Sequence, residues 1–200
     1  MLMGTWRNDG RLDWTCSERI VGDPERTTRG VIEPTIAELA DGSILMVMRG
    51  SNDARHDLPG HRWMSRSTDA GITWTTPVPW TYDDSVAFHS PSSCSQLIPH
   101  SDGRLFWMGN LCEQNPEGNR PRYPIILGEV DRHSGELIRS SVTSIDDRQP
   151  GESEQLTLSN FYVREERGTG DLLLHMPRFF ADDDVPGFSS DLILQRIAIS

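Results

Sequence analysis

The sequence contains three units in which an apolar run, a tight turn ending in glycine and a second apolar run follow one another. The turn glycines are Gly42, Gly103 and Gly170, which lie 61 and 67 residues apart. Aspartate directly precedes the first two of them. Asp-Gly pairs favour hairpin turns because glycine adopts the positive φ of such turns without steric cost. The chain is therefore expected to fold from repeated β-hairpins.

The apolar runs of these units occupy 36–39 with 44–48, 95–98 with 105–108, and 161–163 with 172–176. Further strands are expected at 63–66 with Trp74, at 125–130 paired with 137–138, and at 192–199. No segment of twelve or more residues shows the apolar spacing of an amphipathic helix. Four strands in each unit of ~60 residues, repeated three times, predict propeller blades. The alternative is an ordinary β-sandwich whose hairpins resemble one another by chance.

Charge and hydropathy exclude several classes of function. The formal net charge is −11, and nucleic-acid binding requires a basic face, so no nucleic-acid partner is expected. No apolar run approaches the ~20 residues needed to span a bilayer, so no membrane partner is expected. The first residues lack the layout of a signal peptide. The cytoplasm is the default expectation, with the compartment left open.

Cysteine and acidic residues give no pattern of a metal or cofactor site. The three cysteines, Cys16, Cys94 and Cys112, are odd in number and have no CxxC spacing, so a zinc knuckle or a disulfide framework is not expected. The thiols are interpreted as free and unreactive. The acidic triplet Asp182–Asp184 is interpreted as a solvated loop rather than a calcium site. No cofactor and no metal are expected.

Residues 67–74 read Ser-Thr-Asp-Ala-Gly-Ile-Thr-Trp, which is the pattern of an Asp-box. Ser67 and Asp69 are expected to bond the amides of the turn, Gly71 to take the positive-φ position, and Trp74 to pack between strands. The motif is structural rather than catalytic. Degenerate copies are expected at 9–14 and at 129–135.

The Asp-box and the stretch 30–49 give the chain a resemblance to the sialidase-like, Asp-box (BNR repeat) proteins, which are six-bladed propellers. The resemblance covers about residues 9–200 and implies the C-terminal half of that fold, as a single propeller fragment over 1–200. A blade remnant is expected at 1–30 and blades at about 31–85, 86–150 and 151–200. Six blades need roughly 360 residues. The missing half would therefore come from a longer chain or from a second copy in a homodimer, because an open half leaves sheet edges unpaired.

The resemblance also implies residues of an active site. In sialidases, the corresponding blade carries a glutamate that acts as base and an arginine that binds the substrate carboxylate, and these roles fall on Glu33 and Arg49. A further carboxylate-binding arginine of the next blade falls on Arg122, with Arg120 as the alternate. Arginine suits this role because its planar fork binds a carboxylate through two hydrogen bonds. The alternatives are a strand-start residue for Glu33 and surface charges for the arginines.

The chain departs from the family at one position. The aligned stretch 157–161 has Leu158 where the resemblance implies a tyrosine nucleophile, and leucine cannot attack an anomeric carbon. Tyr162 is nearby, but strand alternation would have to be re-registered to point it inward. The departure argues against a strict sialidase mechanism.

Polar residues near strand ends complete the candidates. Asp53 and His56 follow Arg49 in a loop that could supply a proton donor or a sugar ligand. Asn110 and Arg178 end strands and could line the pocket, while a solvated loop is the alternative for the 52–57 stretch.

The leading interpretation is a sialidase-like glycoside hydrolase acting on terminal sugars of glycans, with an acidic sugar as one option. Two alternatives remain open: a glycan-binding propeller without catalysis, supported by Leu158, and an interaction scaffold in which Glu33 and the arginines are incidental. The expected partner is a glycan or oligosaccharide.

Overall fold

The computed structural model describes residues 1–185 and 187–199, and its fold is all-β. The strands are β1 (Leu2–Trp6), β2 (Leu12–Cys16), β3 (Ile32–Glu38), β4 (Ile44–Arg49), β5 (Arg62–Ser67), β6 (Val78–Pro79), β7 (Gln96–Pro99), β8 (Leu105–Asn110), β9 (Ile125–Val130), β10 (Thr143–Asp146), β11 (Tyr162–Glu165), β12 (Leu172–Pro177) and β13 (Leu192–Ile197). One short 3₁₀ turn, η1 (Arg139–Ser141), precedes β10. The sequence predicted no helix because it lacks helical periodicity, and the described residues contain no α-helix.

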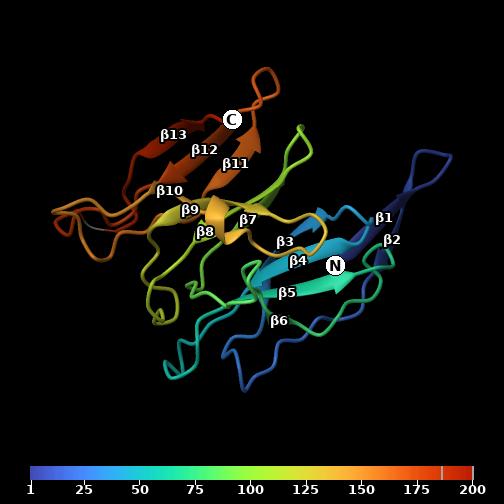
Figure 1. The fold of residues 1–200 in the computed structure, drawn as a ribbon, viewed down its shortest axis with the longest axis horizontal. Helices are drawn as coiled ribbons and strands as arrows, with labels where there is room; N and C mark the ends of the chain where they lie inside the picture. Colours follow the sequence, from blue (N-terminus) through green and yellow to red (C-terminus); the bar gives the residue numbers. More distant parts are fainter. Residues whose placement is uncertain (186, 200) are drawn as a thin grey trace.

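The strands form one hairpin and three larger antiparallel sheets (Figure 1). The β1–β2 hairpin comes first. The first sheet has the order β3-β4-β5-β6, the second β7-β8-β9-β10 and the third β11-β12-β13. Each sheet runs through the strands in chain order, as a meander does. This is the architecture of a partial β-propeller, as the sequence predicts.

The innermost strands of the three sheets lie together. Strand β7 contacts both β3 and β11. The Thr35 hydroxyl accepts a bond of 2.9 Å from the Leu97 amide, so β3 is tied to β7. The Gln96 side chain donates to the Val163 carbonyl at 2.7 Å and accepts from the Val163 amide at 3.1 Å, so β7 is tied to β11. The sheets therefore fan from a shared line of inner strands.

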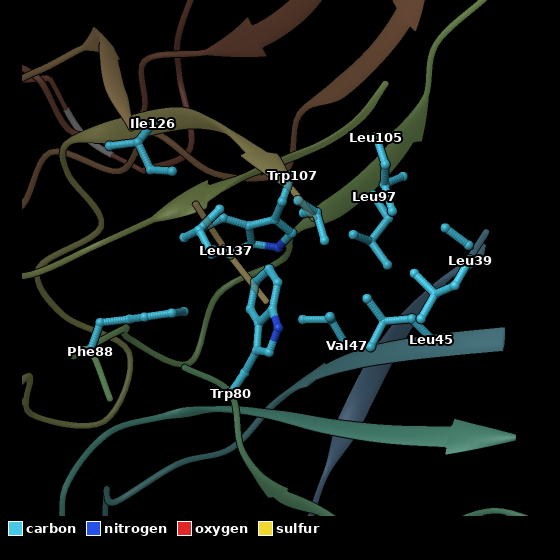
Figure 2. Close-up of a cluster of buried hydrophobic side chains, with 12 residues drawn as sticks. Leu39, Leu45, Val47, Trp80, Phe88, Leu97, Leu105, Trp107, Ile126 and Leu137 are labelled. Atoms are coloured by element: carbon cyan, nitrogen blue, oxygen red, sulfur yellow. The ribbon is translucent and has the colours of Figure 1, made fainter. Parts of the chain in front are cut away.

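An apolar core fills the space between the first and second sheets, and Figure 2 shows it. Its members share burial and come from strands of both sheets and the loops beside them: Ala37, Leu39, Leu45, Val47, Trp80, Phe88, Leu97, Leu105, Trp107, Ile126, Val130 and Leu137. The rings of Trp80 and Trp107 meet edge to face with centroids 5.2 Å apart. Each such large apolar side chain gains about 1.5–3 kcal/mol on burial.

A second core joins the second and third sheets, because the middle strand of the second sheet buries both of its faces. Leu105 and Trp107 point into the first core, whereas Phe106 and Met108 point into the second. Alternation along a strand places successive side chains on opposite faces. A strand that is apolar at every position, as β8 nearly is, therefore predicts a sheet covered on both sides.

The turns of the predicted hairpins are observed at Gly42, Gly103 and Gly170, with φ values of +79, +94 and +78°. Four details of the strands differ from the predictions. Strand β5 pairs with β6 at 78–79, and Trp74 lies in the segment between the two strands rather than in a strand. Strand β9 pairs with 143–146 rather than with 137–138, which contributes one isolated bridge from Leu137 to Val130. The last strand ends at Ile197, two residues early. The third sheet has three strands within the described residues rather than four.

The sheets fall at 32–79, 96–146 and 162–197, each inside one predicted blade. The blade limits and the single-fragment assignment stay predictions, and the limit at residue 200 lies outside the described residues. In the part of the chain that the structure describes, no helix is long and apolar enough to cross a bilayer.

The Asp-box forms the turn after β5. The Asp69 carboxylate accepts bonds from the Thr73 amide (2.9 Å), the Thr73 hydroxyl (2.6 Å) and the Ile72 amide (3.1 Å). The Gly71 amide donates to the Ser67 hydroxyl at 2.9 Å, and the indole of Trp74 donates to the Gly71 carbonyl at 3.0 Å. The turn residues act as the motif predicts.

The two degenerate copies differ from each other. At 129–135, Asp131 accepts bonds from the amides of His133 and Ser134, so the turn is Asp-box-like. At 9–14, Asp9 accepts one bond from the Arg11 amide, but Trp14 is 59% exposed. The 9–14 stretch is therefore a plain hairpin turn without a packed tryptophan, and the prediction of an Asp-box copy there is wrong.

Candidate functional site

Segments from all three sheets meet at one end of the inner strands. They are the start of β3, the end of β4, the start of β5, the loops before β7 and β9, and the loop before β11. Four of their residues are in direct contact, because Glu33 pairs with Arg49, and Arg49 and Arg122 share the Ser92 carbonyl. Arg62 bonds the adjacent Ser93 and completes a set of five residues: Glu33, Arg49, Arg62, Ser92 and Arg122. This set is called the arginine cluster below. It brings together three of the residues that the sequence singled out.

Glu33 stands on an irregularity at the start of β3. The register shifts between Ile32, which pairs with Arg49, and Thr35, which pairs with Val47. One extra residue on β3 makes a bulge, and a bulge redirects a side chain. Glu33 has φ of +50°, in the left-handed region that non-glycine residues rarely adopt, and its side chain is 46% exposed. Strained backbone of this kind gathers at functional sites.

Arg49 ends β4 and is the partner of Glu33. Its Nη2 lies 2.7 Å from Glu33 Oε1, and its Nη1 donates to the Ser92 carbonyl at 3.1 Å. The Arg49 side chain is only 14% exposed. Arg49 therefore links the first sheet to the loop that precedes the second.

Arg122, before β9, donates from Nη2 to the same Ser92 carbonyl at 3.1 Å. Two guanidinium groups from different sheets thus converge on one oxygen. Repulsion between like charges opposes such an approach unless negative charge or acceptors compensate for it. The Ser92 carbonyl supplies such an acceptor at the point where the two guanidinium groups converge.

Arg62, at the start of β5, is a member of the cluster that sequence reasoning missed. It is fully buried, and its guanidinium donates to the Ser90 hydroxyl (2.9 Å), the Ser93 carbonyl (2.6 Å) and the Ser93 hydroxyl (2.8 Å). These bonds fix the loop that presents the Ser92 carbonyl. The register of β4 and β5 sets Arg62 opposite Arg49, and this pairing is the signal that could have placed Arg62 in the cluster.

Burial sets the electrostatics of the cluster. Burial lowers the pKa of Arg62 to about 10, with Cys94 and Glu33 opposing the shift and Arg49 and Arg122 adding to it. The pKa of Arg122 is also lowered, mainly by burial and then by Arg49. The pKa of Arg62 is still well above neutral pH, and guanidinium groups in proteins keep their charge, so the arginines are charged at neutral pH. The cluster therefore carries positive charge that Glu33 offsets only in part.

The other loop candidates lie at the rim. Asp53 accepts a bond of 2.6 Å from the Thr28 hydroxyl, which is the main cause of its lowered pKa, and lies 3.6 Å from Arg29. His56 is exposed in the same loop. Arg120 is exposed on the turn before Arg122 and is near enough to lower the pKa of Arg122 slightly. The structure brings none of the three into contact with Glu33 among the described residues.

Asn110 is buried and has a structural role rather than facing an open pocket. Its side chain is fully buried, and its amide nitrogen is 3.1 Å from the carbonyl oxygens of three residues: Arg122, Pro124 and Leu158. A buried amide group engaged in this way fixes the loops before β9 and β11. The role in lining a pocket that the sequence suggested does not fit this position.

Leu158 is also fully buried and packs in the second core. Its amide donates to the Arg122 carbonyl at 3.0 Å, so its backbone lies beside the cluster while its side chain does not. Tyr162 is 59% exposed on β11. The segment that resembles the nucleophile loop thus offers no hydroxyl of tyrosine to the cluster.

Arg178 belongs to a different cluster, contrary to the sequence-based prediction. Its guanidinium pairs with Asp146 at 2.5 Å and with Glu152 at 2.6 Å, which lie on β10 and in the loop after it. A cavity of about 410 Å³ lies beside it, lined also by Phe180 and Asp182. Because its Nη1 and Nη2 both bond these carboxylates, Arg178 joins the second and third sheets.

The strand order and the shared line of inner strands define a partial β-propeller. The sequence matches the BNR repeat-like domain over residues 2–156. The chain therefore belongs to the BNR repeat-like domain family. No curated protein matches the chain significantly.

Solved structures agree on the fold. A protein of unknown function from Dyadobacter fermentans is similar with a TM-score of 0.61 at 14% identity, covering 97% of this chain and 44% of that one. Trypanosoma rangeli sialidase in complex with the inhibitor DANA is similar with a TM-score of 0.57 at 13% identity, covering 98% of this chain and 27% of that one. The intramolecular trans-sialidase of Ruminococcus gnavus is similar with a TM-score of 0.57 at 17% identity, covering 94% of this chain and 35% of that one. The chain thus spans less than half the length of each of these structures.

Proposed function

We propose that this chain carries part of the active centre of a sialidase-like glycoside hydrolase that acts on terminal acidic sugars. Arg49 and Arg122 bind the sugar carboxylate, and Glu33 acts beside them as base. The observation that carries the proposal is the convergence of both guanidinium groups on one oxygen, each at 3.1 Å. Side chains from two sheets meet at that point, which is what the recognition of a single anionic group requires.

The charge balance supports an anionic ligand. Three arginines, Arg49, Arg62 and Arg122, are partly or fully withdrawn from solvent. Among the residues that the structure describes, Glu33 is the only carboxylate that forms an ion pair with any of them. Charge-assisted hydrogen bonds from guanidinium to carboxylate are about twice as strong as bonds between neutral groups. A carboxylate therefore gains more here than a neutral sugar hydroxyl does.

Glu33 supplies the reactive carboxylate of the proposal. Its side chain is half exposed, so a sugar bound to the arginines can reach it. A carboxylate beside an anomeric carbon either activates a nucleophile or stabilises the positive charge of the transition state. Asp53, at the rim, is the second carboxylate of the proposal.

A binding function without hydrolysis is the second candidate, and the burial of Leu158 favours it. Such a site would retain the arginine cluster and lack a nucleophile. The two candidates share carboxylate recognition and differ only in turnover, so a single set of variants separates them.

The test uses the full chain and two matched ligands, N-acetylneuraminic acid and its methyl ester, which removes only the negative charge. We expect calorimetry or ligand-observed NMR to show at least tenfold weaker binding of the ester. Arg122→Lys should weaken binding of the acid about tenfold, because lysine lacks the planar fork. Arg139→Lys, at an exposed arginine paired with Asp84, is the control and should bind as the wild type does.

Turnover is measured on the same variants with a fluorogenic sialoside. Release of the fluorophore that is abolished in Glu33→Gln supports hydrolysis. Binding of the acid without release supports the second candidate. Equal affinity for the acid and the ester would overturn both.

A further inference from the structure

Cys94 lies against the arginine cluster, on the loop that Arg62 fixes. Its carbonyl is 3.5 Å from Arg62 Nη2, and it follows Ser92, whose carbonyl Arg49 and Arg122 share, by two residues. Its side chain is half-buried rather than enclosed. Cys94 is close enough to Arg62 and Arg122 to raise the pKa of both guanidinium groups, so the thiol lies beside positive charge.

Two groups from the third sheet's entry loop hold the sulfur. The Asn160 amide donates to Cys94 Sγ at 3.1 Å, and the Ser159 hydroxyl lies 3.3 Å from the same atom. Asn160 has φ of +57°, and this left-handed conformation accompanies the placement of its N–H. Donors aimed at a sulfur stabilise the negative charge that a nucleophilic thiol must carry.

Three buried polar groups of the cluster have no hydrogen-bond partner in the described part of the chain. The Ser92 side chain is 2% exposed, and its hydroxyl has no partner among the described residues. In the same described part of the chain, the Nε atoms of Arg49 and Arg122 are buried and have no acceptor. Buried polar groups are normally hydrogen-bonded, so three unused groups in one place require an explanation. A bound carboxylate supplies the acceptors that the two Nε atoms lack.

The other two cysteines differ from Cys94 in what surrounds the sulfur. Burial raises the pKa of Cys112 to about 12, and its thiol donates to the Pro121 carbonyl at 3.7 Å. Cys16 is exposed at the end of β2. Reactive cysteines are partly exposed and lie in positively charged surroundings. Cys112 is half-buried too and feels Arg62, but burial dominates its pKa, whereas Cys94 has an amide donor at its sulfur.

We propose that Cys94 is a covalent modification site for small carboxylate-bearing electrophiles, which the arginine cluster binds next to the thiol. In the reaction, the sulfur forms a bond to the electrophilic carbon, the bond from that carbon to its leaving group breaks, and the thiol proton passes to solvent. The leaving group departs with its electron pair. The inference rests on the carboxylate binding of the proposed function, but it requires no hydrolysis.

The test compares iodoacetate, which carries a carboxylate, with the neutral iodoacetamide on the folded full chain. Mass spectrometry of peptides gives the alkylation rate at each cysteine. The ratio of the iodoacetate rate to the iodoacetamide rate should be at least tenfold higher at Cys94 than at Cys16, the internal reference. Saturating N-acetylneuraminic acid should slow the reaction of Cys94 with iodoacetate and leave Cys16 unchanged.

Variants assign the preference to the cluster. Arg122→Gln should bring the ratio at Cys94 close to that at Cys16, and Arg139→Gln should leave it high. Circular dichroism confirms that each variant is folded, and the wild-type ratio alone decides the case if Arg122→Gln does not fold. Equal ratios at Cys94 and Cys16 in the wild type would overturn the inference.

The variant Cys94→Ser separates this inference from the proposed function. If Cys94→Ser binds N-acetylneuraminic acid while wild-type Cys94 shows no preference for iodoacetate, the proposed function stands and the modification site is wrong. If the acid does not bind and the preference is absent, both are wrong.

Discussion

Glu33 and Arg49 form an ion pair of 2.7 Å between Oε1 and Nη2 across the first hairpin of the first sheet. The candidate base therefore occupies one donor of the candidate carboxylate-binding arginine. A bound carboxylate competes with Glu33 for that donor, and the two negative charges repel each other. The ion pair thus opposes ligand binding while it orients Arg49 for it.

Glu33→Gln should raise the affinity for N-acetylneuraminic acid about three- to tenfold, because the substitution removes a negative charge next to the bound carboxylate. Two charges a few ångströms apart at a solvated surface interact by roughly 1 kcal/mol, which sets this range. Calorimetry measures the change. Glu38→Gln, at an exposed position on the same strand, is the control. A weaker affinity in Glu33→Gln would show that Glu33 acts mainly by orienting Arg49.

The Asp-box turn should lose stability on substitution of Asp69. Asp69→Ala removes the acceptor for the amides of Ile72 and Thr73 and for the Thr73 hydroxyl. We expect a melting temperature lower by at least a few degrees in scanning calorimetry. Ile72→Ala, at an exposed side chain in the same turn, should melt within about one degree of the wild type.

The effect of Asp69 should depend on pH. Hydrogen bonds from Thr73 and from Ser67 lower the pKa of Asp69 from 3.8 to about 2. A lowered pKa in the folded chain stabilises it fully above the unfolded value, and the stabilisation is lost as the pH falls through the folded value. The difference in melting temperature between wild type and Asp69→Ala should therefore be constant above about pH 5 and shrink from pH 4 to pH 2.

Local sequence signals predicted the hairpins because the physics that sets them is local. Asp-Gly pairs select a turn that only a few residues can form, as at Gly42 and Gly103. The pairing of β9 with 143–146 is different, because the chain first passes through a turn and η1 before β10 reaches the edge of the sheet. The strand count of the third sheet likewise depends on chain contacts that no local pattern encodes.

The same distinction between local and long-range contacts decides which site residues could be predicted. Glu33 and Arg49 were predicted by resemblance, and a hairpin joins them, so their pairing depends on a local register. Arg62 was missed because its acceptors, at Ser90 and Ser93, come from another sheet's entry loop. Arg178 was misplaced for the same reason, since the carboxylates that hold it are on other segments. Long-range partners decide whether an arginine binds a ligand or another part of the chain.

The interface between the first two sheets should be sensitive to Trp80. Its ring is fully buried against Trp107, and its indole donates to the Gly135 carbonyl at 2.8 Å. Trp80→Ala should lower the free energy of unfolding by about 3–5 kcal/mol, since it leaves a large cavity. Trp80→Phe retains most of the packing but leaves the carbonyl unpaired, so we expect about 1–3 kcal/mol. Chemical denaturation followed by circular dichroism measures both. An equal loss in the two variants would show that the hydrogen bond dominates.

Arg178 should matter for stability and not for the proposed ligand site. Its side chain and that of Asp146 are 15% and 12% exposed, so Arg178→Met leaves two largely buried carboxylates, Asp146 and Glu152, without their cation. Although burial opposes it, bonding to these carboxylates raises the pKa of Arg178. We expect the free energy of unfolding to fall by about 2–4 kcal/mol in urea denaturation at neutral pH. Affinity for N-acetylneuraminic acid, measured at a temperature where the variant is folded, should stay within twofold of the wild type. A large loss of affinity with normal stability would return Arg178 to the ligand site.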